Sequence, residues 1–238
     1  MHPKADPPVR AGQFGPALYA DWRASSLGEI TEALEHRLIF SLTGSLRGKS
    51  FLDVGCGDGT LAFAGVQQGA ARVSGCDLDQ RMVAKARARA ASDGIRIDLA
   101  VARAQSLPFP AASFDIVTCI TMLTFVSDAD LALREMARVL RPGGRLVIGD
   151  LNKWSVWAAR RRMRGWLGAT LWRAARFRTA KQLRAMTEHA GLTVGPVKGA
   201  IFFPPWMPLA RLMAPLDRTL GDITTLGAAF VAVQATKP

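Results

Sequence analysis

Segments of strand length alternate with segments of helix length along most of this chain, and this alternation limits the folds open to it. Five short apolar segments are candidate strands: residues 50–54, 71–77, 95–101, 113–120 and 145–149. Four further segments space their apolar residues as helices do: residues 28–46, 58–68, 80–91 and 128–140. This order predicts an α/β protein with a doubly wound, mostly parallel sheet and helices on both faces. Ligands of such sheets bind beyond the carboxyl ends of the strands, where the strand order reverses.

Two of the helices can be described more closely. Gly69 follows the helix at 58–68 and is expected to terminate it as a C-terminal cap. The helix at 128–140 ends at an Arg-Pro-Gly-Gly sequence that cannot continue it. Its buried side is predicted to carry four residues: Leu131, Met136, Val139 and Leu140.

A glycine-rich sequence, Gly-Cys-Gly-Asp-Gly at residues 55–59, joins the first strand to the next helix. Glycine accepts a positive φ and lets the backbone pass close to a ligand. Dinucleotide-binding enzymes use similar loops, and a purely structural turn would also need glycine. The glycines alone therefore do not identify the ligand.

Carboxylates around this loop narrow the choice of cofactor. The dinucleotide pattern requires Gly or Ala three positions after Gly57, where this chain has Thr60. Asp53 and Asp58 would repel a pyrophosphate placed at the helix N-terminus, but they suit a ligand that carries an ammonium and a sulfonium. Asp77 lies twenty residues after Gly57, where a carboxylate can accept hydrogen bonds from both ribose hydroxyls. Together these features favour S-adenosylmethionine over NAD.

Four consecutive blocks of this sequence resemble a known family. The blocks are FLDVGCGDGT, VSGCDLDQRMVAKAR, LPFPAASFDIV and LREMARVLRPGGRLVIGDL. In order and spacing they are similar to the class I S-adenosylmethionine-dependent methyltransferases, and most like the ubiquinone and menaquinone biosynthesis branch. The resemblance covers roughly residues 14–150. It implies a Rossmann-like sheet of seven strands in the order 3-2-1-4-5-7-6 with an antiparallel strand seven, formed here by residues 227–235 and paired with a strand near 192–203.

The resemblance also implies how the cofactor is held at its methionine end. Asp53, Gly55 and Gly57 would hold the methionine portion through backbone and carboxylate contacts. Thr121, just past the fourth strand, would lie near the carboxylate or the methionine chain.

The adenosine end follows from the same resemblance. Asp77 would bind the ribose, and Leu78 and Met82 would contact the adenine. The family usually has an acidic residue followed by Ala before the Leu-Pro-Phe motif, but here the pair is Arg103-Ala104. The backbone amide of Ala104 can still serve the adenine, whereas Arg103 cannot accept a hydrogen bond. Arg103 is equally compatible with a solvent-facing position.

The sequence assigns no catalytic residue and offers only candidates. Methyl transfer from a sulfonium is an in-line displacement, so a general base is required only if the acceptor must lose a proton. Tyr19 is one candidate to line the site, because the entry segment of the family folds over the cofactor near a similar aromatic residue. Asp150 and Asn152 follow the fifth strand on the expected acceptor side, and Asp150 can alternatively cap the next helix. His36 and His189 are assigned structural roles.

Positive charge is concentrated in the last third of the chain. The net charge is +12, and residues 151–187 hold ten Lys and Arg residues and no acidic one. Within residues 153–184 a helical face is predicted to carry five apolar residues: Val156, Ala159, Met163, Trp166 and Leu167. Gly165 and Gly168 are expected to loosen or break this helix.

Several functions fit the basic, Trp-rich segment at 153–184. It can be a lid whose tryptophans cover an apolar acceptor, with Ile201 and the Pro-rich stretch to 216 completing the pocket as a rigid, irregular segment. A basic amphipathic helix with tryptophans also suits an anionic membrane surface, and an acidic partner or anionic substrate is a third possibility. Nucleic acid is disfavoured because the tryptophans are expected at buried positions and no nucleic-acid motif accompanies them.

We therefore expect one methyltransferase domain over residues 1–238. Its parts would be N-terminal cap helices (1–48), a cofactor-binding core (49–150), a basic Trp-rich lid (151–191), and C-terminal strands with a Pro-rich insertion (192–238). Cys56, Cys76 and Cys119 are expected at core positions in a reducing compartment, and no metal site is expected. The expected location is the cytoplasm, with peripheral membrane contact as an alternative. Oligomeric state is not indicated.

The expected activity is S-adenosylmethionine-dependent methylation of a small, apolar or amphipathic acceptor at oxygen, nitrogen or carbon. The alternatives are a membrane-binding or acidic-partner-binding protein that keeps the fold without turnover, and an NAD-type oxidoreductase.

Overall fold

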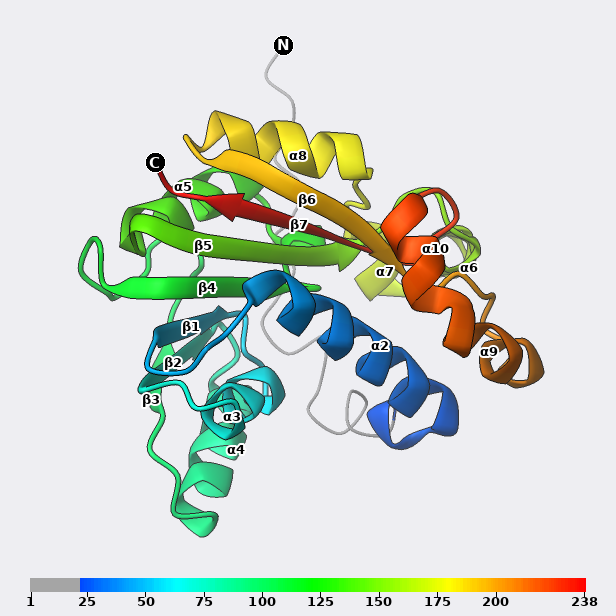
Figure 1. The fold of residues 1–238 in the computed structure, drawn as a ribbon. Coiled ribbons are helices and arrows are strands. Elements are labelled where there is room, and N and C mark those ends of the chain that lie inside the picture. Colours follow the sequence, from blue (N-terminus) through cyan, green and yellow to red (C-terminus); the bar gives the residue numbers. More distant parts are fainter. Residues whose placement is uncertain (1–21) are drawn as a thin grey trace.

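The computed structural model describes residues 22–238, and its seven strands form a single sheet (Figure 1). The strands are β1 (Ser50–Val54), β2 (Arg72–Asp77), β3 (Asp98–Val101), β4 (Phe114–Ile120), β5 (Leu140–Leu151), β6 (Thr193–Ala200) and β7 (Phe230–Thr236). Their order is β3-β2-β1-β4-β5-β7-β6. The pairs among β1 to β5 are parallel, and β7 is antiparallel to both β5 and β6. The predicted Rossmann-like sheet with an antiparallel seventh strand is confirmed.

Helices surround this sheet in the described part of the chain. They are α2 (Ser26–Thr43), α3 (Thr60–Gln67), α4 (Gln80–Ser92), α5 (Ala129–Val139), α6 (Val156–Trp166), α7 (Thr170–Ala174), α8 (Ala180–His189), α9 (Met207–Met213) and α10 (Asp217–Ile223), with 3-10 turns η1 (Leu123–Phe125) and η2 (Ala214–Leu216). Several of these helices start at a residue whose side chain caps the first turn. Ser25, Asp79, Asp128 and Ser155 each accept a hydrogen bond from a backbone N–H of that turn.

Two apolar cores lie on opposite faces of the sheet. On one face, α5 and α8 bury Leu133, Met136 and Leu183 against the strands. On the other face, α2 and α3 bury Ile39 and Leu61 (Figure 1). Helices on both faces leave only the ends of the strands free to form a site.

The structure differs from the predicted bounds at β3 and β5, and from the predicted core at Leu131. β3 begins at Asp98, three residues later than expected, because it is an edge strand that pairs with β2 alone. β5 runs from Leu140 to Leu151, so it includes the Pro-Gly-Gly sequence and Asp150. Leu131, expected in the core, is exposed on α5. It lies five residues before the buried Met136, which is about 140° around a helix.

The basic segment packs differently from the prediction. α6 buries Trp157, Ala158 and Gly165, whereas the predicted apolar face points away from the protein. Trp154 and Trp166 are exposed. The expectation that the tryptophans of this segment are buried is therefore wrong for these two. Gly165 remains within α6, where a Cβ atom would lie only 3.0 Å from the backbone carbonyl carbon of Trp172.

The Pro-rich stretch after β6 is not irregular throughout, contrary to expectation. It forms α9, with Pro208 in its first turn, and η2, with Pro215 in a corresponding position. Proline fits the first turn of a helix because the N–H that it lacks has no partner there. In the described residues, Cys56, Cys76 and Cys119 are free and buried. Among the same residues no helix is long and apolar enough to cross a membrane, and no cluster of potential metal ligands occurs.

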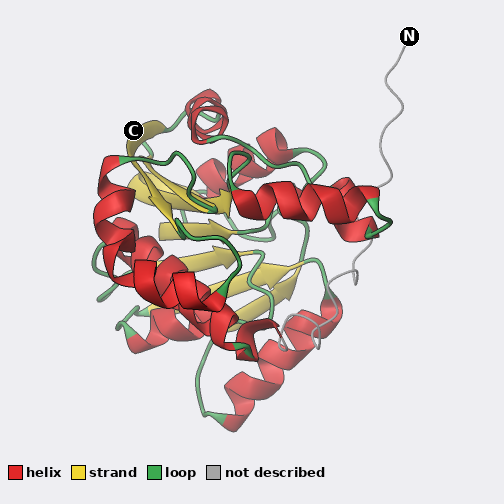
Figure 2. Ribbon diagram, turned by 90° about the vertical axis from the view of Figure 1, so that its right-hand side faces the viewer, coloured by secondary structure: helices red, strands yellow, loops and turns green. Residues whose placement is uncertain are grey.

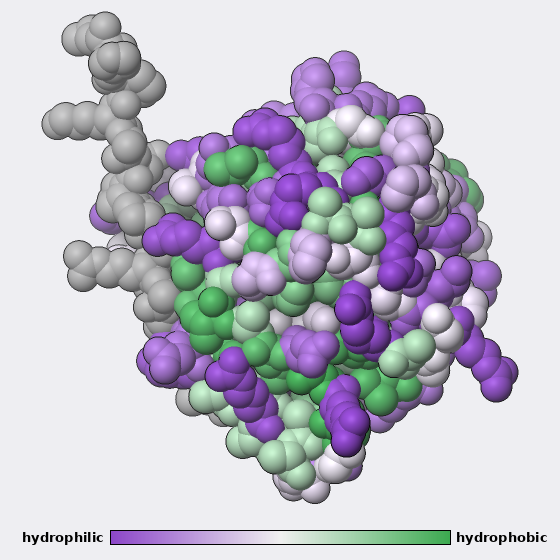
Figure 3. Space-filling view, turned by 90° about the vertical axis from the view of Figure 1, so that its left-hand side faces the viewer, coloured by the Kyte–Doolittle hydropathy of each residue, from purple (hydrophilic) through white to green (hydrophobic). Residues whose placement is uncertain are grey.

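The two ends of the sheet differ in what covers them. α6, α7, α9 and α10 gather at the end where the parallel strands terminate (Figures 1 and 2). The opposite end, which carries the amino termini of these strands, shows hydrophilic and hydrophobic residues interspersed over its surface (Figure 3). These four helices thus stand around the end of the sheet where a ligand is expected, whereas α8 covers a face of the sheet.

Candidate active site

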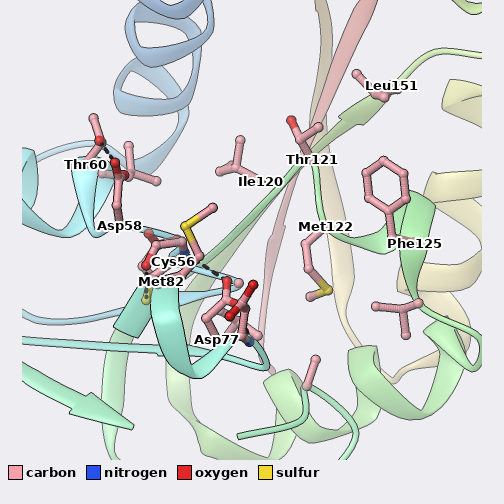
Figure 4. A pocket seen from close by; sticks show the side chains of 18 of the residues that line it. Cys56, Asp58, Thr60, Asp77, Met82, Ile120, Thr121, Met122, Phe125 and Leu151 are labelled. Atoms are coloured by element: carbon pink, nitrogen blue, oxygen red, sulfur yellow. Dashed lines mark hydrogen bonds between the residues drawn. The ribbon is translucent and has the colours of Figure 1, made fainter. Parts of the chain in front are cut away.

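A cavity of about 350 Å³ opens at the carboxyl ends of β1, β2 and β4. The sequence predicts eight cofactor-binding residues, and all of them line this cavity: Asp53, Gly55, Gly57, Asp77, Leu78, Met82, Ala104 and Thr121. In Figure 4, Asp77, Cys56 and Met82 lie on one side of the cavity, opposite Thr121, Met122 and Phe125. The sheet thus brings together residues from four separate segments of the sequence.

The glycine loop is shaped by backbone conformations that only glycine adopts easily. Gly55, Gly57 and Gly59 have φ values of 79°, 54° and 86°. A Cβ atom at Gly55 would lie 2.6 Å from Cγ of Met122, so the loop also passes close to the opposite wall. A side chain at position 55 would therefore displace Met122 from its place in the cavity wall.

Asp77 is held at the end of β2 by two backbone amides. Its Oδ2 accepts a hydrogen bond from Gly57 N at 2.9 Å, and its Oδ1 accepts one from Asp79 N at 2.8 Å. Burial raises the pKa of this carboxyl, while the two amides act in the opposite direction. The carboxylate therefore has a fixed orientation at the cavity wall and spare lone pairs for a ligand hydroxyl.

Asp53 lies deeper in the same wall. Its Oδ1 accepts a hydrogen bond from Oγ1 of Thr118 at 3.0 Å, and the residue is almost completely buried. Burial, together with the negative charge of Asp77, raises the pKa of Asp53 from 3.8 to about 7 against the effect of the hydrogen bond from Thr118. Two neighbouring carboxyls that repel each other in this way are stabilised by a ligand with positive charge.

Asp58 does not share that role, contrary to the argument from the sequence. Arg23 contacts it with two hydrogen bonds of 3.0 Å, and Nζ of Lys85 lies 3.3 Å from its Oδ2. The pKa of Asp58 is lowered by these cations against the effect of burial. Because the protein itself neutralises Asp58, the preference for a cationic ligand depends on Asp53 and Asp77.

The predicted adenine contacts lie toward the rim of the cavity. Met82 is buried at the start of α4, whereas Leu78 is partly open to solvent. Ala104 is half-buried, and Arg103 is exposed beside it. An apolar floor and an open rim suit a flat ring with one polar edge, and Arg103 occupies the position where the family usually has an acid.

Two β-branched residues of the cavity wall adopt left-handed backbone conformations. Thr121 has a φ of 53° and Ile201 a φ of 64°. Such values are genuine outliers for β-branched residues and cost on the order of 1–3 kcal/mol. Each is held by a main-chain hydrogen bond, from Thr121 N to Gly149 O at 2.7 Å and from Ala229 N to Ile201 O at 2.9 Å. Strain of this kind is common where a binding site must have a defined shape.

A second compartment of the cavity is formed by α2 and α6. Trp157 packs edge-to-face on Trp22, with ring centroids 5.8 Å apart, and its Nε1 donates to Phe203 O at 2.7 Å. Arg161 lies with its guanidinium carbon 5.2 Å from the Trp157 ring centre and 5.1 Å from that of Trp172. This compartment combines the two tryptophan rings with the cation of Arg161.

Glu35 and His36 of α2 line the same compartment. Burial raises the pKa of Glu35 to about 7, while the positive charge of Arg161 opposes the shift. Burial lowers the pKa of His36. A carboxyl that titrates near neutrality in a cavity is a typical candidate for proton transfer.

The other catalytic candidates from the sequence are corrected or lie outside the description. Asp150 is fully buried within β5, where its Oδ1 accepts a hydrogen bond from Oγ1 of Thr124 at 2.6 Å. It does not line the cavity, and Ser155 caps α6 in its place. The side-chain amide of Asn152 donates to the carbonyls of residues 225 and 228 and is also buried. Tyr19 lies outside the described residues.

Sequence reasoning missed the second compartment of the cavity. Glu35 lies far in sequence from Trp157 and Arg161, and none of the three belongs to a motif. One signal is present: Trp157 and Arg161 are four residues apart, so they share a helix face, but the apolar spacing assigns that face to solvent.

Comparisons with known proteins agree with this geometry. A family model described as a methyltransferase domain matches residues 52–148. A ubiquinone biosynthesis O-methyltransferase of Idiomarina loihiensis is 35% identical over 168 residues, which cover 68% of this chain and 69% of that protein. The chain belongs to the class I S-adenosylmethionine-dependent methyltransferases. Its methyl donor is accordingly S-adenosylmethionine, and its fold is that of the family.

Two further comparisons show how far the likeness of this methyltransferase extends. A 27-O-demethylrifamycin SV methyltransferase of Amycolatopsis mediterranei is 38% identical over 135 residues, and the match spans about half of that protein, 49%. The solved structure of an S-adenosylmethionine-dependent methyltransferase of Thermotoga maritima, described as a possible histamine N-methyltransferase, superposes with a TM-score of 0.71. The superposition covers 96% of this chain and 99% of the Thermotoga chain. At 21% identity, this likeness shows a shared fold.

Proposed function

We propose that this methyltransferase methylates a hydroxyl group of a small, apolar or amphipathic acceptor bound between α2 and α6. The observation that carries the proposal is the second compartment, where Trp22, Trp157 and Ile201 line the same cavity as the carboxyl group of Glu35. Aromatic walls favour an acceptor with an apolar body. The name of the Idiomarina relative, an O-methyltransferase, supports oxygen as the methylated atom.

The cofactor side fits S-adenosylmethionine on the evidence of its carboxyl groups. Asp53 and Asp77 share one wall and burial raises the pKa of each, so a ligand ammonium and sulfonium would relieve their repulsion. In this proposal Asp53, Gly55, Gly57 and Thr121 hold the methionine portion. The ribose hydroxyls donate to Asp77, whose other contacts orient it. Leu78, Met82 and the amide of Ala104 then serve the adenine.

The acceptor side supplies a proton acceptor. S-adenosylmethionine supplies an electrophilic methyl group, whose bond to sulfur breaks with both electrons going to sulfur as the bond to the acceptor oxygen forms. Glu35 in its carboxylate form takes the proton that the acceptor hydroxyl loses. Arg161 lowers the energy of negative charge on that oxygen during the transfer. The aromatic walls exclude water, which strengthens both effects.

Binding of the cofactor can be tested without knowledge of the acceptor. Isothermal titration calorimetry with S-adenosylmethionine and S-adenosylhomocysteine should give micromolar dissociation constants. Asp77→Ala should weaken binding of both by roughly 100-fold, because two charge-assisted hydrogen bonds are lost. Asp93→Asn is the matched control, since Asp93 is exposed and ion-paired to Arg89 at 3.6 Å away from the cavity. Absence of heat in wild-type protein shown to be folded by circular dichroism would refute the assignment of this cavity.

The acceptor class requires a transfer assay. Radiolabelled methyl from S-adenosylmethionine should appear on hydroxylated aromatic probes, such as catechols with an apolar side chain, and should be absent from the corresponding amines. Labelling of the amines alone would show that oxygen is the wrong acceptor atom.

A further inference from the structure

α6 has an inner face and an outer face of very different character. Its inner face is buried and carries Trp157, Ala158 and Gly165. On the outer face, large apolar side chains are exposed to solvent: Val156 (61%), Met163 (52%), Trp166 (84%) and Leu167 (80%). Soluble proteins seldom turn the apolar stripe of an amphipathic helix outward, so this stripe indicates a binding surface.

Arginines border the outer apolar stripe on both sides. At 100° per residue, Arg160 and Arg164 lie next to Val156 and Leu167, and Arg162 lies beyond Trp166 on the other side. An apolar stripe with a basic border is the pattern of a helix that lies in the plane of a membrane interface.

The segment that contains α9 and α10 lies at the same end of the sheet as α6 and also exposes apolar side chains. It exposes a further set of large apolar side chains: Trp206 (61%), Leu212 (71%), Leu216 (59%), Ile223 (78%) and Leu226 (76%). The hydrogen bond from Trp157 to Phe203 O ties α6 to the start of this segment, and that from Asn152 to Thr225 O ties the residues before α6 to its end. Figure 1 shows α6, α9 and α10 at the same end of the molecule.

The charges of the second segment are also unbalanced in the positive direction. Asp217 is buried and accepts a hydrogen bond from Phe202 N at 3.0 Å, and Asp222 is ion-paired with Lys198 at 2.6 Å. Arg211 and Arg218 are exposed. The acidic groups of this segment are thus buried or paired, while its arginines face solvent.

We infer that α6, together with the exposed residues of 206–226, docks on an anionic phospholipid surface. Met163, Trp166 and Leu167 enter the boundary between headgroups and acyl chains, and Arg160, Arg162 and Arg164 contact lipid phosphates. A nucleic acid fits less well, because phosphates would meet the apolar centre of the stripe instead of its basic border. The combination of an apolar centre and a positive border matches a negatively charged bilayer on both counts.

This surface is continuous with the acceptor compartment through a single helix. Trp157 and Arg161 on the inner face of α6 line the cavity, and Arg160 and Met163 on the outer face lie in the docking surface. A docked protein therefore holds the acceptor compartment next to the lipid. This last step rests on the proposed function and makes the acceptor class an amphipathic molecule dissolved in the membrane.

Co-sedimentation with lipid vesicles tests the docking. Full-length protein is mixed with vesicles of phosphatidylcholine alone or of phosphatidylcholine with phosphatidylglycerol, at low and at physiological salt. We expect pelleting with the anionic vesicles only, and less of it at the higher salt. Arg160→Gln with Arg164→Gln should weaken the partition coefficient at low salt by roughly 30-fold. Trp166→Ser with Leu167→Ser should also lose pelleting, while Arg47→Gln with Arg96→Gln, exposed arginines outside this surface, should bind as the wild type does.

Each variant is also titrated with S-adenosylhomocysteine, which shows that it is folded and separates docking from catalysis. Pelleting with intact affinity for S-adenosylhomocysteine supports the docking even if no acceptor is found. Negligible pelleting of the wild type with both kinds of vesicle overturns it. Equal pelleting of the α6 variants and the control variant also overturns the docking proposal. If the wild type instead forms a dimer in sedimentation velocity that Trp166→Ser with Leu167→Ser abolishes, and no vesicle is bound, the surface belongs to a second copy of the chain.

Discussion

Asp53 shows how one buried side chain links protonation to stability and to ligand binding. Burial raises its pKa in the folded protein from 3.8 to about 7. The folded protein therefore binds a proton in this range that the unfolded chain releases. The contribution of Asp53 to the free energy of unfolding is present below pH 3.8 and is lost as the pH rises to about 7.

A prediction about the ligand-free protein follows from Asp53. Its free energy of unfolding, measured by urea denaturation, should fall between roughly pH 4.5 and pH 7 more steeply in the wild type than in Asp53→Asn, which cannot ionise. Conversely, the affinity of the wild type for S-adenosylhomocysteine should rise over the same interval, since the ligand ammonium prefers an ionised Asp53. Identical slopes for the two proteins would mean that Asp53 ionises normally.

The second prediction at this scale concerns Glu35 as proton acceptor. It must be ionised to act, so the rate of transfer to a hydroxylated probe should rise with pH up to about 7, the pKa that burial gives it. His36, Glu32 and Arg161 also line this region, and burial lowers the pKa of His36 below its usual value. Glu35→Gln should lower kcat by roughly 100-fold or more and remove the inflection, with affinity for S-adenosylhomocysteine unchanged.

Two controls distinguish catalysis from packing at Glu35. Glu32→Gln removes a neighbouring carboxyl that pairs with Arg23 at 3.6 Å, and it should leave the inflection in place. His36→Gln tests the other titratable group. If the inflection disappears with His36→Gln and persists in Glu35→Gln, the histidine is the proton acceptor.

At the scale of elements, the contact between α10 and β6 depends on the absence of a side chain. A Cβ atom at Gly221 of α10 would overlap the carbonyl oxygen of Gly199 in β6. Gly221→Ala must therefore push α10 away from the sheet. We expect the free energy of unfolding to fall by about 1–3 kcal/mol, as for other overpacked sites, in a urea titration.

Gly195→Ala is the matched control for Gly221→Ala. Gly195 lies in the same strand as Gly199, and its Cβ would meet its nearest neighbour, the Gln234 side chain, at an ordinary 3.5 Å. This variant should be close to the wild type. Equal destabilisation by both substitutions would indicate that β6 tolerates no added side chain, and the close approach of α10 would not be the cause.

Much of the order of elements could be predicted, because it depends on local sequence. The first strand, at Ser50–Val54, has the bounds that the sequence predicts, because an apolar run ends there at glycines. The faces of helices were harder to predict. Leu131 and the stripe from Val156 to Leu167 have helical spacing, but spacing does not tell which side meets the sheet. For α6 the buried side was decided by the hydrogen bond from Trp157 to Phe203 O and by the close approach of the Trp172 backbone to Gly165. Neither contact produces an apolar pattern within the helix.

For the whole molecule, ligand binding should increase stability in proportion to affinity. At a concentration of S-adenosylhomocysteine about 100 times its dissociation constant, the free energy of unfolding rises by about 2.7 kcal/mol. For a chain of this length that corresponds to an increase in Tm of roughly 5–10 °C in a thermal-shift assay. NADH should leave the Tm unchanged. A shift with NADH and none with S-adenosylhomocysteine would favour the oxidoreductase alternative that the glycine loop allowed.

The candidate site was predictable on one side only, for a physical reason. The cofactor side is built from loops that follow β1, β2 and β4, and each loop carries its own glycines and carboxylates in a short stretch of sequence. Even there the chain's own cations changed one role, since Arg23 and Lys85 neutralise Asp58 from distant positions. The second compartment is assembled from α2, α6 and the turn at Ile201, none of which carries a local pattern.

The sequence by itself determined the class of fold, the position of the glycine loop and the preference for a cofactor with positive charge, because these depend on residues close together along the chain. Only the tertiary structure decided that Glu35 and Arg161 share a compartment, that Asp150 is sealed inside β5 and that the apolar stripe of α6 faces outward. Those outcomes depend on which surfaces of distant elements are buried against each other, and burial is a property of the whole packing arrangement.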